Sequence, residues 1–272
     1  MRKLLVLIIS MLGLLGAGTA LAADPDPETT NQSPWRLGVA LGYGIRTNPL
    51  ALSDDIPIIV NLDIGWFGKR WFFDNGDLGL MVVDRDHYTV DLVARLNNDR
   101  VFFDKTNTRF ISVGDGADGP VLEKVKVPDR DYAFEVGVEF LADGNWGYFQ
   151  ATAFQDISGT HGGYELFADY SYSVRRQRWF IEPSFGVSWK SEELNDYYWG
   201  VREDETNILF PAYSAGAGMN AHARLLVSYQ VNRDWAFVAV GEYERINSEA
   251  ASSPIVVEQD VLGIFAGFRY EY

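Results

Sequence analysis

The sequence contains no cysteine, only three histidines and comparatively few basic residues. The absence of cysteine excludes disulfides, thiolate metal sites and catalytic thiols. No two histidines are paired at helix or strand spacing, so we expect no metal site and no cofactor. Acidic residues outnumber basic ones by 38 to 23, which gives a net charge of −15. Because nucleic-acid recognition relies on basic surface, we expect no nucleic-acid partner.

Long apolar runs are also scarce. One run covers residues 4–15, follows two basic residues and precedes a small-x-small motif that ends at Ala22. This order is typical of a signal peptide, so we expect residues 1–22 to be removed on export. The next stretch, 23–34, is polar and proline-rich, which predicts a flexible mature N-terminus. No later stretch approaches the roughly 18 apolar residues of a transmembrane helix.

Alternation of apolar and polar residues is the abundant feature. The last stretch, VLGIFAGFRYEY, places apolar side chains at every second position and ends on an aromatic residue. A period of two predicts a strand, and eight segments of the chain show it. We therefore predict an all-β protein, an antiparallel transmembrane β-barrel over residues 35–272. Its C-terminal insertion signal consists of Phe268, Tyr270 and Tyr272.

Short polar turns give a second indication of a barrel. An aromatic residue follows each turn or opens the first strand, as expected for a girdle at the lipid–water boundary. These aromatic residues are Trp35, Trp71, Tyr88, Trp146, Trp179 and Trp235. Because barrels of this kind have short periplasmic turns, we assign the girdle to the periplasmic side. The longer loops, 45–56, 98–130, 190–216 and 246–258, then face outward.

The strand count depends on one short hairpin around Asn75-Gly76, a pair favoured in tight turns. Counting its two arms gives 12 strands. Both arms are shorter than the roughly nine to eleven residues that usually span a membrane, so ten strands is the alternative. A soluble β-sandwich or lipocalin-like barrel also shows alternation. The signal peptide, the terminal aromatic residue and the one-sided girdle favour the membrane barrel.

Charged residues occupy the polar face of the strands and are expected in the barrel lumen. The predicted lumen residues are Asp63, Asp91, Arg95, Glu135, Glu139, Glu165, Asp169, Glu182, Arg224 and Arg269, and Arg36, Glu242 and Glu271 share their face. We favour mutual pairing across a narrow, largely filled interior, with Glu135 and Glu139 close to arginines. The alternative is a cation-preferring pore, because acidic residues are in excess.

The stretch DISGTH holds the ingredients of a nucleophilic triad: Asp156, Ser158 and His161. A working triad needs the base within hydrogen-bond reach of the nucleophile and a third group that orients it. Six residues of one tight loop do not easily provide that series of hydrogen bonds. We therefore predict a structured turn rather than an active site, and no enzymatic activity.

Several stretches are similar to the MltA-interacting protein (MipA)/OmpV family of outer-membrane proteins. They are DISGTHGGY (156–164), NDYYWGV (195–201), SPIV (253–256), GYGIRTNP and DIPIIV. The family-motif loop residues are Asp156, Ser158, Gly159, His161, Tyr164, Tyr197, Tyr198 and Gly200. One departure is Gly162, where the family often has aspartate.

The resemblance implies an outer-membrane barrel in contact with outer-membrane lipid. It also implies a scaffold that brings a murein-degrading lytic transglycosylase together with a murein synthase. A narrow channel for small solutes and a surface adhesin remain the alternatives.

Overall fold

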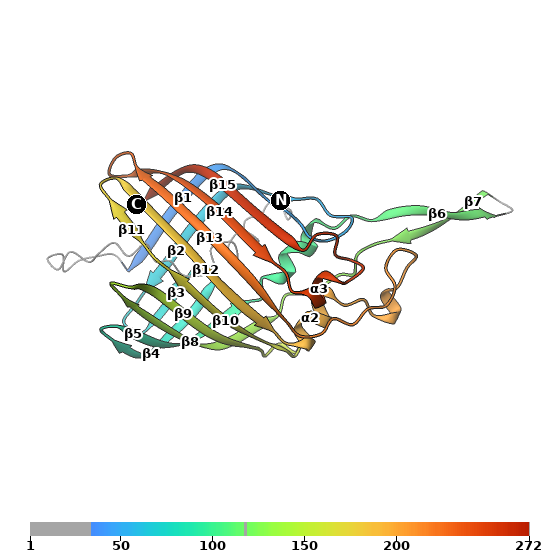
Figure 1. Ribbon diagram of the computed structural model, residues 1–272, viewed down its shortest axis with the longest axis horizontal. Coiled ribbons are helices and arrows are strands. Elements are labelled where there is room, and N and C mark those ends of the chain that lie inside the picture. The colour runs from blue at the N-terminus through green and yellow to red at the C-terminus, as the bar shows by residue number, and fades with distance from the viewer. Residues whose placement is uncertain (1–33, 117–118, 272) are drawn as a thin grey trace.

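The computed structural model describes residues 34–116 and 119–271, and these form one closed antiparallel barrel (Figure 1). The expected signal peptide, most of the expected flexible N-terminus and Tyr272 lie outside the described residues. The barrel strands are β1 (Trp35–Arg46), β2 (Ile56–Phe67), β3 (Trp71–Asp74), β4 (Asp77–Arg85), β5 (Tyr88–Leu96), β8 (Phe134–Gly144), β9 (Gly147–Asp156), β10 (Tyr164–Ser171), β11 (Val174–Arg176), β12 (Trp179–Lys190), β13 (Gly218–Gln230), β14 (Trp235–Arg245) and β15 (Asp260–Glu271). The predicted all-β barrel is confirmed.

The wall contains 12 strands, because β10 and β11 both pair with β12 and together form one interrupted strand. The alternative of ten strands is wrong, since the β3–β4 hairpin is part of the wall. The last strand pairs with the first, with Phe268 opposite Leu41, and this pairing closes the barrel. At this seam a Cβ atom on Gly42 would lie 2.1 Å from the carbonyl oxygen of Ala266. The close approach of the two backbones therefore requires glycine there.

The six aromatic residues of the predicted girdle are all exposed on the outside of the described barrel. Five short turns join the strands at the end of the barrel where these residues lie, which we call the turn end (Figure 1). Some girdle rings pack against aromatic neighbours on the next strand: Trp179 lies 4.8 Å from Tyr229 and Trp235 lies 5.2 Å from Tyr270, between ring centroids. The opposite end carries the long loops and is called the loop end.

A β-bulge changes which side of the wall the side chains face in the loop-end half of β2. Leu41 pairs with Val60, but the next pair is Gly44 with Ile58, so β1 contributes one residue more than β2. This shift reverses the alternation. Ile58 is 5% exposed and faces the lumen, whereas its neighbour Ile59 is 54% exposed. Unbroken alternation over IIVNLDIGW predicts that Ile58 faces lipid together with Val60 and Leu62, and the bulge makes this prediction wrong for Ile58.

The β3–β4 hairpin is short and ends part of the way up the wall. Asn75, at its tip, has φ of 49° and closes the ladder to β2. Its backbone N–H donates to the carbonyl of Ile64, and its side-chain oxygen accepts from the N–H of Ile64. Beyond this point, no strand in the described parts of the chain pairs with that edge of β2. The wall is thus incomplete beside residues 56–63.

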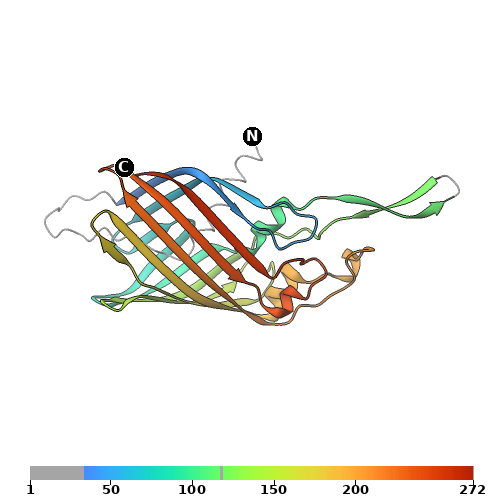
Figure 2. The ribbon, with the colours of Figure 1, turned by 45° about the horizontal axis from the view of Figure 1, so that its top comes forward.

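The loop end is covered by a cap that has its own apolar core. Its elements are the 3-10 helices η2 (Asp99–Lys105) and η3 (Glu203–Glu205), the helices α2 (Glu192–Trp199) and α3 (Ser248–Ala251), and the hairpin of β6 (Arg109–Gly116) and β7 (Gly119–Val125). The hairpin extends well beyond the barrel, whereas α2 and α3 lie across its mouth (Figure 2). Phe103 packs between Tyr198 and Trp199, with ring centroids 6.2 Å from each. None of the helices in the described ranges has the length and apolarity needed to cross a bilayer.

Candidate functional site

The charged residues of the lumen gather beneath the cap, where several strands bring opposite charges together. Arg95 on β5 donates from Nε to Glu135 on β8 at 2.8 Å and from a terminal nitrogen to Glu165 on β10. Its guanidinium carbon also lies 3.7 Å from the centroid of the Phe154 ring. Two carboxylates and one aromatic face therefore fix this arginine.

A second ion pair joins the cap to the wall. Nζ of Lys190, at the end of β12, lies 2.6 Å from both carboxylate oxygens of Asp99. Asp99 begins η2, so this contact holds η2 inside the mouth of the barrel. The sequence alternation places Lys190 on the lumen face, but no pattern in the loop indicates that Asp99 is its partner.

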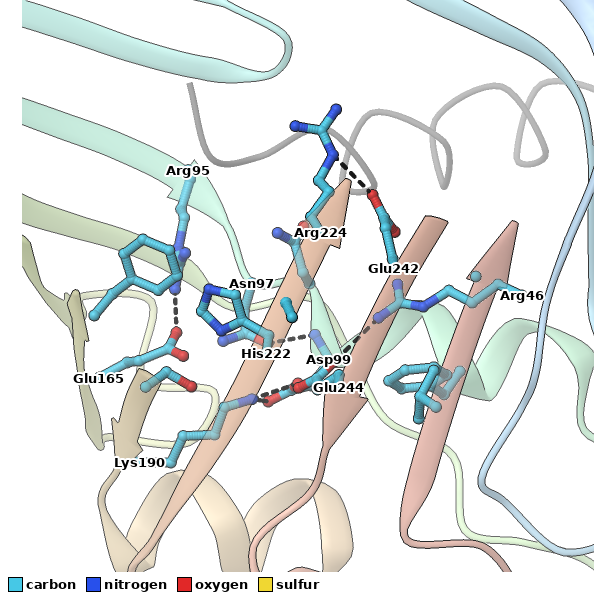
Figure 3. A pocket seen from close by; sticks show the side chains of 17 residues that line it. Arg46, Arg95, Asn97, Asp99, Glu165, Lys190, His222, Arg224, Glu242 and Glu244 are labelled. Atoms are coloured by element: carbon cyan, nitrogen blue, oxygen red, sulfur yellow. Dashed lines mark hydrogen bonds and ion pairs between the residues drawn. The ribbon is translucent and has the colours of Figure 1, made fainter. Parts of the chain in front are cut away.

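The remaining charges of this cluster lie on β1, β13 and β14. Arg46 contacts Glu244 at 3.2 Å, and Arg224 contacts Glu242 at 3.3 Å. Nε2 of His222 lies 2.9 Å from the carboxylate of Asp169, and the imidazole stacks on Phe167. The residues Arg46, Arg95, Asp99, Glu165, Lys190, His222, Arg224, Glu242 and Glu244 surround one cavity of about 180 Å³ (Figure 3).

Nearer the turn end, a smaller group joins β1 to the β2–β4 region. Arg36 contacts Asp63 at 3.0 Å and Asp74 at 2.6 Å. Asp91 accepts a hydrogen bond from Thr89 at 3.3 Å. Arg269 lies on the lumen face opposite Ala40 and Ala236.

Two predicted lumen carboxylates have neutral partners. Glu139 accepts hydrogen bonds from Gln150 and Thr152, so the expectation of a nearby arginine is wrong for this residue. Glu135, in contrast, does bind Arg95. Glu182 accepts from the hydroxyl of Ser173. The lumen-facing side of a strand follows from alternation, whereas the identity of the partner depends on which strands adjoin.

The DISGTH loop is a structured turn organised by one carboxylate. Asp156 accepts from the backbone N–H and the hydroxyl of Ser158 through one oxygen, and from the N–H groups of His161 and Gly162 through the other. His161 points away from Ser158: Nε2 lies 3.1 Å from Glu135, and Nδ1 accepts from the N–H of Gly163. No triad geometry is formed. Gly159 has φ of 73°, which favours glycine.

The tyrosine-rich motif lies on α2 and joins the cap to the segment before β8. The hydroxyl of Tyr197 accepts from the N–H of Asp131, and the hydroxyl of Tyr198 donates to the carbonyl of Asp131. Burial, and then the nearby Asp99 and Glu135 carboxylates, raise the pKa of Tyr198. This phenol therefore stays neutral at physiological pH.

The ends of α2 are also fixed. Ser191 caps its first turn and accepts from the N–H of Tyr164, while the carbonyl of Gly200 accepts from Arg130 at 2.8 Å. Arg130 also forms a two-pronged contact with Glu205, at 2.7 and 3.1 Å. Burial opposes ionisation of Glu205, but hydrogen bonds from Arg130 and from the Arg202 backbone outweigh it and lower its pKa. Within residues 34–116 and 119–271, no three histidine or carboxylate side chains gather as a metal site.

A family model described as "MltA-interacting protein MipA" matches residues 37–272. Outer membrane protein OmpV of Vibrio cholerae is 25% identical over 261 residues, which cover 94% of each chain. Outer membrane protein Omp26La of Vibrio anguillarum is 30% identical over 125 residues, 46% of this chain and 47% of that protein. The MltA-interacting protein of Escherichia coli K12 is 25% identical over 145 residues, 53% of this chain and 58% of that protein. These last two matches span about half of each protein compared.

Proposed function

The chain belongs to the family of the MltA-interacting protein MipA, and on that premise we propose that this outer-membrane barrel is a non-enzymatic scaffold. Its partners would be a murein-degrading lytic transglycosylase and a murein synthase. The names of the relatives describe interaction or outer-membrane proteins rather than enzymes. The barrel would then position a binding surface at the membrane, and no solute would pass through the lumen.

The observation that carries this proposal is the covered loop end. The cap packs an apolar core across the mouth, and the Lys190–Asp99 ion pair ties it to the wall. Below it, lumen charges pair with one another, as between Arg95 and Glu135. A covered mouth and paired charges favour an anchor over a pore.

A basic surface at the turn end is the contact that we propose for the partner. Three arginines, Arg175, Arg176 and Arg178, lie in or beside β11 and are all exposed. The β13–β14 turn adjoins them, since the carbonyl of Arg178 accepts from the N–H of Gln230. This turn adds the exposed Arg233. Such a surface would bind an acidic face of a periplasmic partner.

One feature favours a narrow cation-preferring channel as the second candidate. Asp91 and Glu182 each have a buried carboxylate oxygen without a hydrogen-bond partner in the described structure. Unmatched carboxylates favour cations. Single-channel recordings that stay closed would exclude this candidate.

The scaffold is tested by capture of purified lytic transglycosylase and bifunctional murein synthase on the folded barrel. The triple variant R175Q/R176Q/R178Q should weaken capture of at least one enzyme. The matched control, E192Q/E193Q/E203Q, removes three charges at the loop end and should leave capture unchanged. Absence of capture by the unaltered barrel, or equal capture by both triple variants, would count against the proposal.

A further inference from the structure

One wall of the lumen is apolar, although the interiors of transmembrane barrels are usually polar. Neighbouring strands place these side chains in register: Leu226 lies opposite Val240, and Val240 lies opposite Phe265. The next step around the wall, through Gly44, leads to Ile58. We call this surface the lumen strip, and it consists of Ile58, Phe180, Leu226, Val238, Val240 and Phe265.

The lumen strip faces inward, because it shares a face with charged lumen residues. Leu226 is two positions from Arg224 along β13, and Val240 is two positions from Glu242 along β14. Residues two apart on a strand point to the same side. The strip therefore continues directly below the charged cluster, toward the turn end. Replacing water beside an apolar surface of the lumen with an apolar ligand lowers the free energy.

Arg224 lies at the loop-end border of the strip and has fewer hydrogen-bond partners than the other cations of the charged cluster. Its contact with Glu242 joins Nε to the carboxylate at 3.3 Å, and Nε makes no hydrogen bond in the described structure. Arg95, in contrast, binds two carboxylates, and Lys190 binds both oxygens of Asp99. A guanidinium has five N–H donors, so Arg224 keeps donors for an additional anion. Figure 3 shows its guanidinium directed away from the rest of the cluster.

We propose that the lumen binds a single-chain anionic amphiphile, with the chemistry of a fatty-acid carboxylate. The carboxylate binds Arg224, and the acyl chain lies along the lumen strip. Ser184, opposite Arg224 on β12, adds a buried hydroxyl beside the head group. The apolar rows below Arg224 are those of Leu226 and Ser228, so from Arg224 the strip extends two two-residue steps, roughly 13 Å, which suits a medium-length extended acyl chain.

The chain's own residues are poor competitors for this surface. Residues 23–33 precede the first strand at the turn end, and their sequence is ADPDPETTNQS. They contain no aliphatic or aromatic side chain larger than alanine and proline, so they do not match an apolar strip. Their three carboxylates match only the Arg224 end.

The test uses the folded barrel in nanodiscs with dansyl-labelled undecanoate as the probe, and empty nanodiscs as background. Unlabelled dodecanoate should displace the probe at least tenfold better than dodecyltrimethylammonium, which has the same chain and the opposite charge. R224Q should weaken displacement by dodecanoate by roughly tenfold or more, since it removes a charge-assisted contact. Displacement by dodecanol should be unchanged in R224Q.

Three further variants separate binding from folding. V240T adds a hydroxyl to the strip and should weaken the binding of dodecanoate, dodecyltrimethylammonium and dodecanol alike. V138T, on the exposed face of β8, should weaken the binding of none of them. R224K retains the charge and should recover part of the dodecanoate affinity. Heat-induced mobility shifts in gels verify that each variant is folded. Equal displacement by dodecanoate and dodecyltrimethylammonium overturns the proposal, as do equal affinities in V240T and V138T. Displacement by a peptide of residues 23–33 but not by dodecanoate would assign the strip to the chain itself.

Discussion

Nε2 of His161 lies 3.1 Å from Oε1 of Glu135, and both side chains are fully buried. The same carboxylate accepts from Arg95 on β5 and from Asn97. Glu135 therefore joins the DISGTH loop to the charged cluster of the lumen. The loop is a structural clamp between β9 and the cap, which explains its three glycines and its single histidine without any catalytic role.

The first prediction concerns this clamp. His161→Ala removes a partner of Glu135 and the acceptor of the Gly163 N–H. Leaving buried polar groups without partners should lower the free energy of unfolding by about 1–3 kcal/mol. Urea unfolding of the barrel in detergent measures the change. His87→Ala is the matched control, because His87 lies in an exposed turn. Equal effects of the two substitutions would contradict the clamp.

Alternation gave most strand positions because lipid enforces it: outward side chains must be apolar, so the period of two persists over each strand. β12, for example, begins at Trp179, which the sequence pattern places at the start of a strand. Ile58 was misplaced, because a bulge leaves no mark in an apolar run that is compatible with either face.

Contacts between segments that are distant in the sequence are harder to predict. Lys190 and Asp99 are 91 positions apart, and their pairing depends on how a loop folds back into the mouth. The neutral partners of Glu139 depend on the register between β8 and β9, where Glu139 lies opposite Thr152. Register is set by turns and bulges together, so the charge pattern alone did not reveal it.

The second prediction concerns the attachment of the segment after α2. Arg130 is 1% exposed and binds both Glu205 and the carbonyl of Gly200. Arg130→Met should release this segment, so limited proteolysis should cut near residues 200–217 much faster than in the unaltered protein. Arg202→Met is the control, since Arg202 is exposed and lies 3.6 Å from Glu205. Similar cleavage rates for both variants would show that Arg130 does not hold the segment.

The third prediction is the pH dependence of the same attachment. The pKa of Glu205 is lowered in the folded protein, so the ion pair contributes fully above the ordinary glutamate value of about 4.3. As the pH falls through the lowered pKa, the carboxylate is protonated and the contribution is lost. Cleavage by an acid-active protease should therefore accelerate below about pH 4. Glu205→Gln should remove this acceleration and be cleaved rapidly at every pH.

The fourth prediction concerns the incomplete part of the wall. Asn75 bonds the backbone of Ile64 in both directions and also donates to Asp63 and Asp74. Asn75→Gly keeps the positive φ and loses the side-chain bonds, while Asn75→Ala loses both. Stability should therefore fall in the order unaltered, glycine, alanine, and hydrogen exchange should increase in β3 first. An alanine variant as stable as the glycine variant would show that backbone conformation is unimportant at this tip.

The last prediction concerns the ion pair between Asp99 and Lys190, and it separates the closed lumen from a pore. Both side chains are buried, so removing one partner leaves an unpaired charge and should lower stability by about 3–5 kcal/mol. Asp99→Asn and Lys190→Met should each loosen η2 in the mouth, and planar-bilayer recordings should then show openings that the unaltered barrel lacks. The double variant D99L/K190M removes both charges and replaces them with apolar groups, which should restore stability and closure because no charge remains unpaired. If the unaltered barrel already conducts steadily, and the single variants change neither conductance nor stability, then the ion pair does not hold the cap and the lumen is an open channel.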